Sequence, residues 1–329
     1  MQANRMKVLG VSIAAAAMHA TSSLHAQNYP TKPIHVVVPV PAGALTDVLS
    51  RKIASVASQK MGQPWIMENK PGANFMPAAE QCRHSAPDGY TLCVFTTSTL
   101  TFNPVLIEKL PYDPDKDFQP IINLGMLIGG LVASPKLAGE VKTIDDLKKM
   151  ALANPAKLNF GTYGPGSSAN VFREYINRQW GTNIVEVGYK GSNELLAALI
   201  AGEIHMTWTA LGSWAENPNN SKGIVLVADS FKRSPRMPNV PLYEEVGIKD
   251  YPIQTWMGLF APKGVPAAII EQVNKVVAET INDPAVNEFL INQVVEPRPT
   301  NVAAFAKQVA TERVETAKVL TGLNIPKIK

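Results

Sequence analysis

Two short loops in this sequence combine glycine with small hydroxyl residues, a composition typical of anion-binding loops. The first runs from Ala42 to Asp47 and the second from Thr162 to Ser168. Each lies between an apolar run and a helical pattern, so unpaired N–H groups and the positive end of a helix dipole would face a bound anion. The two loops together predict a carboxylate held between them, although either loop alone is better explained as a tight turn. The candidate ligand-binding residues of these loops are Ala42, Gly43, Ala44, Leu45, Thr46, Asp47, Thr162, Tyr163, Gly164, Gly166, Ser167 and Ser168.

The sequence offers little material for catalysis. After residue 26 the histidines are His35, His84 and His205, and no pair of them has the spacing of metal ligands. Neither a G-x-S-x-G nucleophile elbow nor a P-loop occurs. We therefore expect a binding protein rather than an enzyme, with no catalytic residue, no metal and no cofactor.

The second loop also admits a nucleotide-binding interpretation. The run from Gly164 to Ala169 fits G-x-G-x-x-A, and Glu186 follows about 20 residues later, as in a dinucleotide fingerprint. Pro165 stiffens a loop that usually needs freedom, and no soluble nicotinamide pool is expected outside the cytoplasm. The anion-binding interpretation is therefore the better one.

The two cysteines flank a turn. Cys82 and Cys93 lie on either side of Ala86-Pro87-Asp88-Gly89, so a helix end and the following strand could bring them together in an oxidising compartment. We predict a disulfide. Two independent buried thiols are the alternative, because sequence spacing does not fix the distance between the two Cα atoms.

The N-terminus has the pattern of a secretory signal peptide. Arg5 and Lys7 precede an apolar stretch from Val8 to Met18, and a small-residue cleavage site ends at Ala26, with Ala20 as an alternative. Residues 1–26 are therefore predicted to be removed as the protein reaches the periplasm. Removing two basic residues lowers the formal net charge from +4 to +2, which excludes the charge balance of a nucleic-acid-binding protein.

Strands and helices alternate along the mature chain, which indicates an α/β fold. Ile34 to Val38 predicts a strand, and Thr46 to Met61 predicts a helix with Thr46 as its N-cap. The same strand-to-helix order recurs at Tyr90–Phe95, Leu158–Gly161 and Ile184–Val187, and Ala267–Ile281 has a clear helical period. The strand Tyr90–Phe95 leads into Thr96-Thr97-Ser98-Thr99. Of these, Thr97, Ser98 and Thr99 complete the set of candidate ligand-binding residues with hydroxyl groups.

The length of the chain predicts two lobes rather than one core. No flexible linker is visible, so we expect the chain to cross between the lobes on ordered strands near Leu127–Ser134 and Gln254–Pro262. Lobe 1 would contain residues 27–129 and 251–329, and lobe 2 would contain residues 130–250.

Segments along nearly the whole mature chain resemble the receptors of the tripartite tricarboxylate transporter family, also called Bug-type solute-binding proteins. The matching segments include Tyr29-Pro30-Thr31-Lys32-Pro33-Ile34, Glu68-Asn69-Lys70-Pro71-Gly72-Ala73, Ala86-Pro87-Asp88-Gly89-Tyr90-Thr91-Leu92, Leu110-Pro111-Tyr112-Asp113-Pro114, Tyr189-Lys190-Gly191-Ser192, Arg233-Ser234-Pro235 and Gly258-Leu259-Phe260-Ala261-Pro262. The resemblance implies a type II periplasmic-binding-protein fold that encloses a small carboxylate, held by the two loops, between two α/β lobes. It also implies delivery to a membrane permease, and we expect the receptor to act as a monomer.

The chain departs from the family pattern at two places that bear on the ligand. Gly43 is followed by Ala44 and Leu45 where the family commonly has a second glycine, and Thr209 stands where an acidic residue is common. The loss of that acid weakens the case for an amino-acid ligand. Leu45 together with the aromatic residues Tyr163 and Trp208 would suit an aromatic or longer aliphatic carboxylate, with hydroxyls from Thr99, Thr162, Ser167 and Thr209 at the polar ends.

Several of these assignments have structural alternatives. Tyr163 and Trp208 could equally be core residues, and Asp47 could equally be a partner of the helix dipole. At the level of function, the alternatives are a secreted hydrolase on the same fold and a ligand sensor for a membrane signalling protein.

Overall fold

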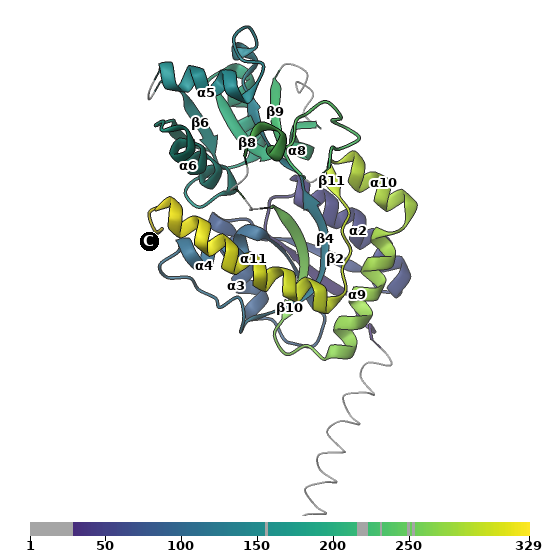
Figure 1. Cartoon of the computed structure of the whole chain (residues 1–329). Helices are drawn as coiled ribbons and strands as arrows, with labels where there is room; N and C mark the ends of the chain where they lie inside the picture. The colour runs from purple at the N-terminus through teal and green to yellow at the C-terminus, as the bar shows by residue number, and fades with distance from the viewer. Residues whose placement is uncertain (1–28, 155–156, 216–222, 231, 249–250, 252–253) are drawn as a thin grey trace, which may run out of the picture.

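The computed structural model describes residues 29–154, 157–215, 223–230, 232–248, 251 and 254–329. Its strands form two sheets, and each sheet with its covering helices makes one lobe (Figure 1). The predicted signal peptide, residues 1–26, lies outside the described residues. Within them, no helix combines the length and the apolar character that crossing a bilayer requires.

Lobe 1 is built on a mixed sheet whose inner strands are almost entirely buried. Helices cover both faces: α2, α9 and α10 pack on one, and α3 and α11 on the other. The strands, in spatial order, are β11 (Val295–Glu296), β4 (Phe118–Leu127), β10 (Trp256–Pro262), β3 (Thr91–Thr96), β1 (Ile34–Val38) and β2 (Trp65–Asn69). The helices are α2 (Leu45–Met61), α3 (Met76–Arg83), α4 (Asn103–Leu106), α9 (Ala267–Ile281), α10 (Pro284–Asn292) and α11 (Val302–Leu323).

Lobe 2 repeats this three-layer plan on a smaller sheet. Helices α5 and α6 pack on one face, and α7 and α8 pack on the other. The strands, in spatial order, are β7 (Val185–Gly188), β6 (Asn159–Thr162), β8 (Met206–Ala210), β5 (Gly129–Ala133) and β9 (Ile224–Asp229). The helices are α5 (Ile144–Ala153), α6 (Ser168–Trp180), α7 (Ser192–Ala201) and α8 (Leu211–Ala215).

The parallel order of the strands places the candidate loops at facing edges. In lobe 1, β1 pairs in parallel with β2 and β3, and in lobe 2, β6 pairs in parallel with β7 and β8. Because parallel strands end at the same edge of a sheet, the loops after β1 and β3 emerge together, as do those after β6 and β8. Both edges face the junction between the lobes.

Local sequence signals predicted most elements correctly. The helix Ala267–Ile281 has the predicted bounds, and Thr143 with Asp146 forms the capping box that their spacing indicates. One prediction was wrong: Thr46 is not the N-cap of α2, because the helix already begins at Leu45 and Ala44 occupies the cap without a side-chain hydrogen bond.

The chain crosses from lobe 1 to lobe 2 where β4 passes through Ile128 into β5. It re-enters the lobe 1 sheet at β10, which begins at Trp256. The lobe boundaries predicted at residues 129/130 and 250/251 stay a prediction.

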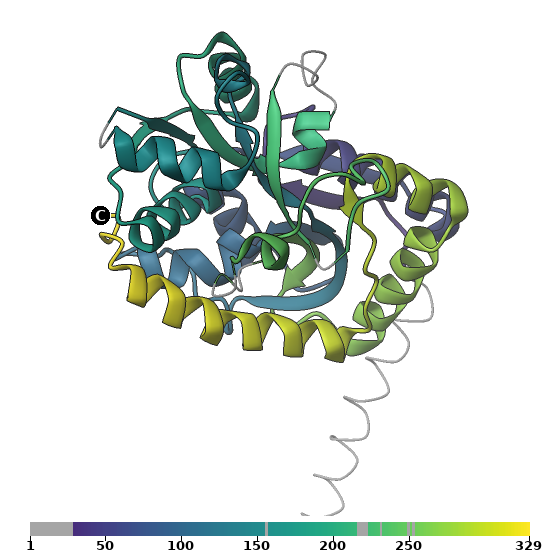
Figure 2. The same cartoon turned by 45° about the horizontal axis from the view of Figure 1, so that its top comes forward.

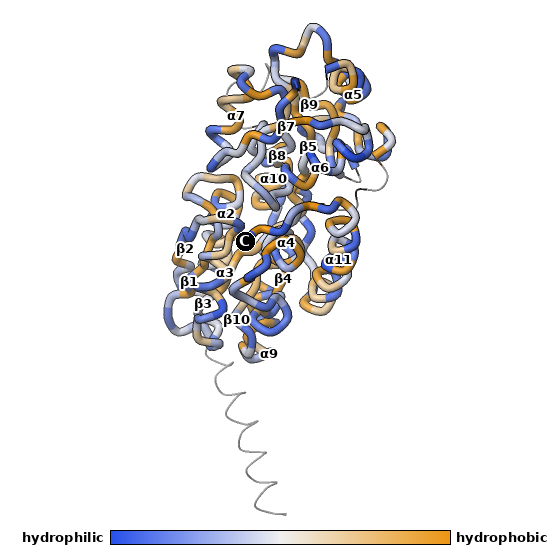
Figure 3. The backbone as a smooth tube through the Cα atoms, turned by 90° about the vertical axis from the view of Figure 1, so that its left-hand side faces the viewer, coloured by the Kyte–Doolittle hydropathy of each residue, from blue (hydrophilic) through white to orange (hydrophobic). Residues whose placement is uncertain are grey.

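The C-terminal helix α11 contacts both lobes. Phe305 and Val309 near its start pack against the lobe 1 sheet, whereas Leu320 near its end joins an apolar cluster with Phe160 and Ala169 of lobe 2. Figures 1 and 2 show this long helix running along one side of the molecule from α9 toward α4 and α6. Its tube alternates between apolar and polar colours in Figure 3, as expected for a helix with one buried side.

Candidate functional site

Asp47 organises the loop between β1 and α2. Its carboxylate accepts hydrogen bonds from the Gly43 N–H at 2.9 Å, Arg51 Nε at 2.9 Å and Asn69 Nδ2 at 2.8 Å. Burial alone would raise the pKa of Asp47, but the hydrogen bonds from Arg51, Asn69 and Gly43 outweigh it and lower that pKa. The carboxylate therefore shapes the loop, and Gly43 contributes its positive φ of 82° rather than a free N–H group.

The start of α2 keeps open donors beyond this anchor. Ala44 supplies no side-chain cap, and among the described residues the N–H groups of Leu45 and Thr46 have no acceptor. Unpaired N–H groups at the start of a helix of 17 residues carry its partial positive charge. In the first loop, an anion would therefore be bound by the N–H groups of Leu45 and Thr46 at the helix start, and not by the N–H group of Gly43.

The loop between β6 and α6 is anchored in a similar way by Glu186. Thr162 Oγ1 donates to Glu186 and accepts from the Gly164 N–H at 3.0 Å. Asn170 accepts from the Gly166 N–H at 3.1 Å and donates to Glu186 at 3.0 Å. Glu186, the acid that fitted the nucleotide fingerprint, therefore holds the loop by accepting hydrogen bonds from Thr162 and Asn170. This structural role explains its position in the sequence without a bound nucleotide.

Ser167 is the N-cap of α6, as its position after the glycines suggests. Its Oγ accepts from the Asn170 N–H at 3.2 Å and donates to the Gly164 carbonyl oxygen at 2.8 Å. Ser168 forms no side-chain hydrogen bond with the described residues, and its N–H group has no acceptor among them. The open donors of the second loop are thus at Ser168 and at the next residue, Ala169.

A buried run of hydroxyl residues, Thr96 to Thr99, begins at the last residue of β3 and is called the hydroxyl segment here. Thr97 Oγ1 donates to the Gln254 carbonyl oxygen at 3.0 Å and accepts from the Trp256 N–H at 2.9 Å. By contrast, the Oγ1 atoms of Thr96 and Thr99 are buried and have no partner in the described chain. Such atoms are costly to bury unpaired, so they mark this segment as a place where a polar ligand would fit.

The hydroxyl segment lies at the junction of the lobes. The segment leads into a helical turn, Ser98–Phe102. Phe102, the last residue of this turn, packs in the same apolar cluster as Phe160 and Ala169 of lobe 2. A hydroxyl placed here can reach a ligand that both lobes enclose.

Of the two aromatic candidates, one is a core residue and one borders the junction. Trp208 is buried, lies against Gly129, and donates from Nε1 to Tyr243 Oη at 2.8 Å. Tyr163 is 38% exposed overall, while its hydroxyl lies 3.2 Å from Thr209 Oγ1 and has a pKa raised by burial. The structure therefore joins Tyr163 to Thr209 and directs Trp208 into the lobe 2 core.

The two loops also contact the opposite lobes. A Cβ atom added to Gly212 of α8 would lie 2.1 Å from the Gln293 carbonyl oxygen and 3.0 Å from Leu45 Cδ2. A Cβ added to Gly166 would lie 2.9 Å from Ile328 Cδ1 near the C-terminus. The first loop thus faces α8 of lobe 2, and the second loop faces the C-terminal segment.

The predicted disulfide is confirmed: Cys82 Sγ and Cys93 Sγ are bonded, with Cα atoms 6.2 Å apart. The histidines have local partners, since His35 pairs with Glu68 and His205 with Asn159. No group of three His, Cys, Asp or Glu side chains in the described part of the chain could hold a metal ion.

Sequence reasoning missed Asp229, at the end of β9. This residue is 9% exposed, its Oδ2 has no hydrogen-bond partner in the described chain, and burial raises the pKa of its carboxyl to about 8. The available signal was an acid that directly ends the apolar run Ile224–Ala228. A charge at the end of a buried strand lies at the sheet edge that faces the other lobe.

Comparison with known proteins gives the same picture over nearly the whole chain. A UPF0065 protein of Cupriavidus necator is 32% identical, over 94% of this chain and 94% of the relative. A solved periplasmic transporter is 31% identical with a TM-score of 0.84, covering 91% of this chain and 99% of its own. Rpa4515 of R. palustris, solved with adipate, is 27% identical with a TM-score of 0.85, covering 91% and 100%.

The sequence model of the tripartite tricarboxylate transporter family receptor matches residues 49–325. The matched span includes both sheets apart from β1, and it includes the second loop and the hydroxyl segment. The solved structures share the two-lobe architecture of periplasmic binding proteins. The chain is a member of the tripartite tricarboxylate transporter family of receptors.

Proposed function

We propose that this receptor binds a small carboxylate between its lobes in the periplasm and delivers it to a membrane permease of the tripartite tricarboxylate type. The observation that carries the proposal is that two helix starts, at Leu45 and at Ser168, keep N–H groups without acceptors among the described residues, on loops at the two sheet edges that meet at the junction, where buried threonine hydroxyls also lack partners. Such donors complement a carboxylate without requiring an arginine.

The relatives support this ligand class. The adipate in the Rpa4515 structure is a dicarboxylate, and the alignment with that protein covers 91% of this chain. The periplasmic location is supported by the signal-peptide pattern of residues 1–26 and by the description of the related structure as a periplasmic transporter. The family description names a receptor of a transporter family, which supports a membrane transport protein as the partner.

Isothermal titration calorimetry with adipate and its diamide tests the carboxylate assignment. We expect adipate, or another member of a mono- and dicarboxylate panel, to bind the mature protein, and we expect the matched amides not to bind. Equal binding of acids and amides would contradict an anion site. Failure of every acid in the panel would remove the proposed ligand class.

Thr99→Val tests the hydroxyl segment. Because Thr99 Oγ1 is buried and unpaired, its loss should not lower the free energy of unfolding, but it should weaken carboxylate binding about fivefold or more. Thr280→Val is the matched control, since Thr280 is equally buried but donates to the Val276 carbonyl oxygen within α9. That control should lose stability and keep its affinity; unchanged binding in Thr99→Val would exclude this hydroxyl as a ligand donor.

A further inference from the structure

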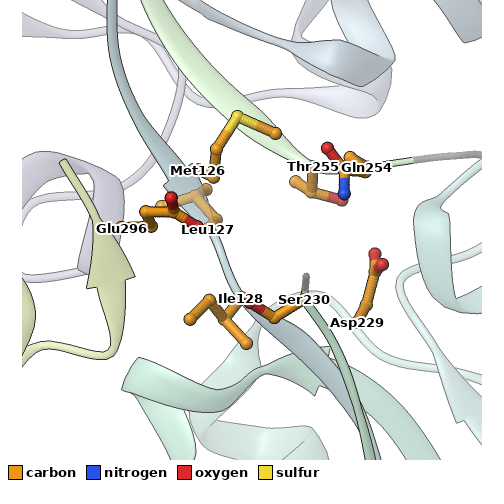
Figure 4. Close-up of a pocket in the computed structure, with 8 residues that line it drawn as sticks. All are labelled: Met126, Leu127, Ile128, Asp229, Ser230, Gln254, Thr255 and Glu296. Atoms are coloured by element: carbon orange, nitrogen blue, oxygen red, sulfur yellow. The ribbon is translucent and has the colours of Figure 1, made fainter. Parts of the chain in front are cut away.

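A small polar pocket lies at the strand crossing, and it is called the hinge pocket here. Its cavity volume is about 10 Å³, room for one water-sized group such as an ammonium. Its walls come from both lobes and from both segments at which the chain passes between them. The lining residues are Met126, Leu127, Ile128, Asp229, Ser230, Gln254, Thr255 and Glu296 (Figure 4).

Asp229 is the unsatisfied group of this pocket. It is more than nine-tenths buried, and its Oδ2 has no hydrogen-bond partner in the described chain. Figure 4 shows its carboxylate directed into the pocket toward Gln254 and Thr255. No Lys or Arg of the described residues forms an ion pair with it. A buried carboxyl without a partner is destabilising, so its presence points to a group that the free protein does not contain.

The groups around Asp229 define what that group must be. The hydroxyl of Tyr251 is also buried without a partner, and burial followed by the nearby Asp229 raises the pKa of Tyr243 and Tyr251. Glu296, the other acid of the pocket, lies 3.3 Å from Lys232 Nζ and is already paired. The described residues therefore offer Asp229 no cationic partner, and burial keeps its carboxyl protonated until a cationic hydrogen-bond donor stabilises the carboxylate form.

The hinge pocket adjoins the proposed carboxylate site. The Gln254 carbonyl oxygen, at the pocket wall, accepts the hydrogen bond from Thr97 of the hydroxyl segment. In the lobe 2 sheet, Asp229 of β9 lies opposite Gly129 of β5 in the strand register. Thr209 of β8 lies opposite the next residue of β5, Gly130. One ligand could thus contact the hydroxyl segment with its carboxylate end and the hinge pocket with another group.

We propose that Asp229 receives a protonated amine of the ligand, so that the receptor selects amino-carboxylates over simple carboxylates and dicarboxylates. This inference rests on the proposed function, because it assigns the second end of a ligand whose first end is the carboxylate. It supplies the acid that the sequence lacks at Thr209, but from a different strand. An ammonium group supplies a counter-charge and stabilises the ionised form of Asp229, and the ligand then forms charge-assisted hydrogen bonds at both ends.

The experiment compares ligands that differ only in one group. Calorimetry is carried out on the mature protein with straight-chain acids from three to six carbons. Each length is tested as the fatty acid, the dicarboxylate, the α-amino acid and the ω-amino acid. The same panel is titrated into Asp229→Asn and into Asp113→Asn, a control that removes an acid paired with Lys116 outside the pocket. Binding of the fatty acids and dicarboxylates reports whether each variant is folded and competent.

At one or more lengths an amino acid should bind more tightly than its fatty acid and its dicarboxylate. Asp229→Asn should weaken that binding about thirtyfold or more and leave the acids without an amine unchanged. Asp113→Asn should change neither. The inference would be overturned, while carboxylate capture stands, by binding that does not depend on the amine, by full amino-acid affinity in Asp229→Asn, or by an equal loss in Asp113→Asn. Binding of no acid at all would instead remove the proposed function, and the inference with it.

Discussion

At the residue scale, Asp47 holds the first loop through its bonds to Gly43, Arg51 and Asn69. Its position at the start of α2 also complements the helix dipole. These contacts explain how a loop with one glycine, followed by Ala44 and Leu45, keeps its helix start open. The acid contributes to binding by positioning the loop, so its removal should affect stability as well as affinity.

Asp47→Ala should lower the free energy of unfolding by about 2 to 3 kcal/mol, because it leaves the Gly43 N–H and the Asn69 side chain without their acceptor. Urea denaturation of the free protein measures this change. Asp113→Ala is a control at an acid whose partner, Lys116, is largely exposed, and it should change stability much less. Equal losses in the two variants would contradict the anchoring role of Asp47.

Asp229 makes the stability of the free protein depend on pH. Burial raises the pKa of its carboxyl to about 8 in the folded protein, against about 3.9 in an unfolded chain. The folded state therefore keeps a proton that the unfolded state has lost, so stability falls as the pH rises from about 4 to about 8 and levels off above that.

Between pH 5 and pH 8 the wild-type protein should lose about 2 to 4 kcal/mol more unfolding free energy than Asp229→Asn, which has no proton to release there. Urea titrations at the two pH values measure the difference. Tyr243, Tyr251, Glu296 and Lys232, which surround the pocket, are present in both proteins, so the difference isolates Asp229. Parallel pH profiles would show that this carboxyl is not held neutral by burial.

At the element scale, the disulfide joins α3 to β3, the strand that leads into the hydroxyl segment. Cys82 and Cys93 are separated by 11 positions, and both are fully buried. A closed loop of this length restricts the unfolded chain and should contribute about 3 kcal/mol to stability.

The Cys82→Ala, Cys93→Ala double variant should therefore unfold at lower urea concentration than the oxidised protein. Urea denaturation of the reduced wild-type protein measures the effect of the covalent bond alone, because both buried sulfur atoms remain. Reduction should reproduce most of the stability lost in the double variant. A reduced protein as stable as the oxidised one would show that the bridge adds nothing.

At the scale of the whole molecule, Gly212 allows the lobes to meet. A side chain there would overlap the Gln293 carbonyl oxygen and press on Leu45 at the first loop. Gly212→Ala should therefore hold the lobes apart and leave each core intact. If the closed form becomes less populated, ligand affinity falls in proportion.

We expect Gly212→Ala to weaken carboxylate binding about tenfold or more, with little change in the far-ultraviolet circular dichroism spectrum. Gly139→Ala is the matched control, because a Cβ there meets nothing within 4 Å and the backbone is unstrained. It should bind as the wild-type protein does. Full affinity in Gly212→Ala would mean that binding does not require this contact between the lobes.

The sequence by itself determined the α/β class, most helix and strand positions, the two loops and the disulfide. These features depend on neighbours in the chain, such as the hydrophobic period of Ala267–Ile281 or the short turn between Cys82 and Cys93. Chain length predicted two lobes, and the family resemblance added their type II periplasmic-binding-protein arrangement, which no local period contains.

Only the tertiary structure decided which polar groups remain free to bind a ligand. Glu186 accepts hydrogen bonds from Thr162 and Asn170 at the second loop, and Asn69 donates to Asp47 at the first loop. Trp208 joins the core because Tyr243 accepts its N–H. Asp229 became visible as a candidate for the same reason: burial and the absence of a partner are properties of the three-dimensional surroundings, which are assembled from distant segments of the chain.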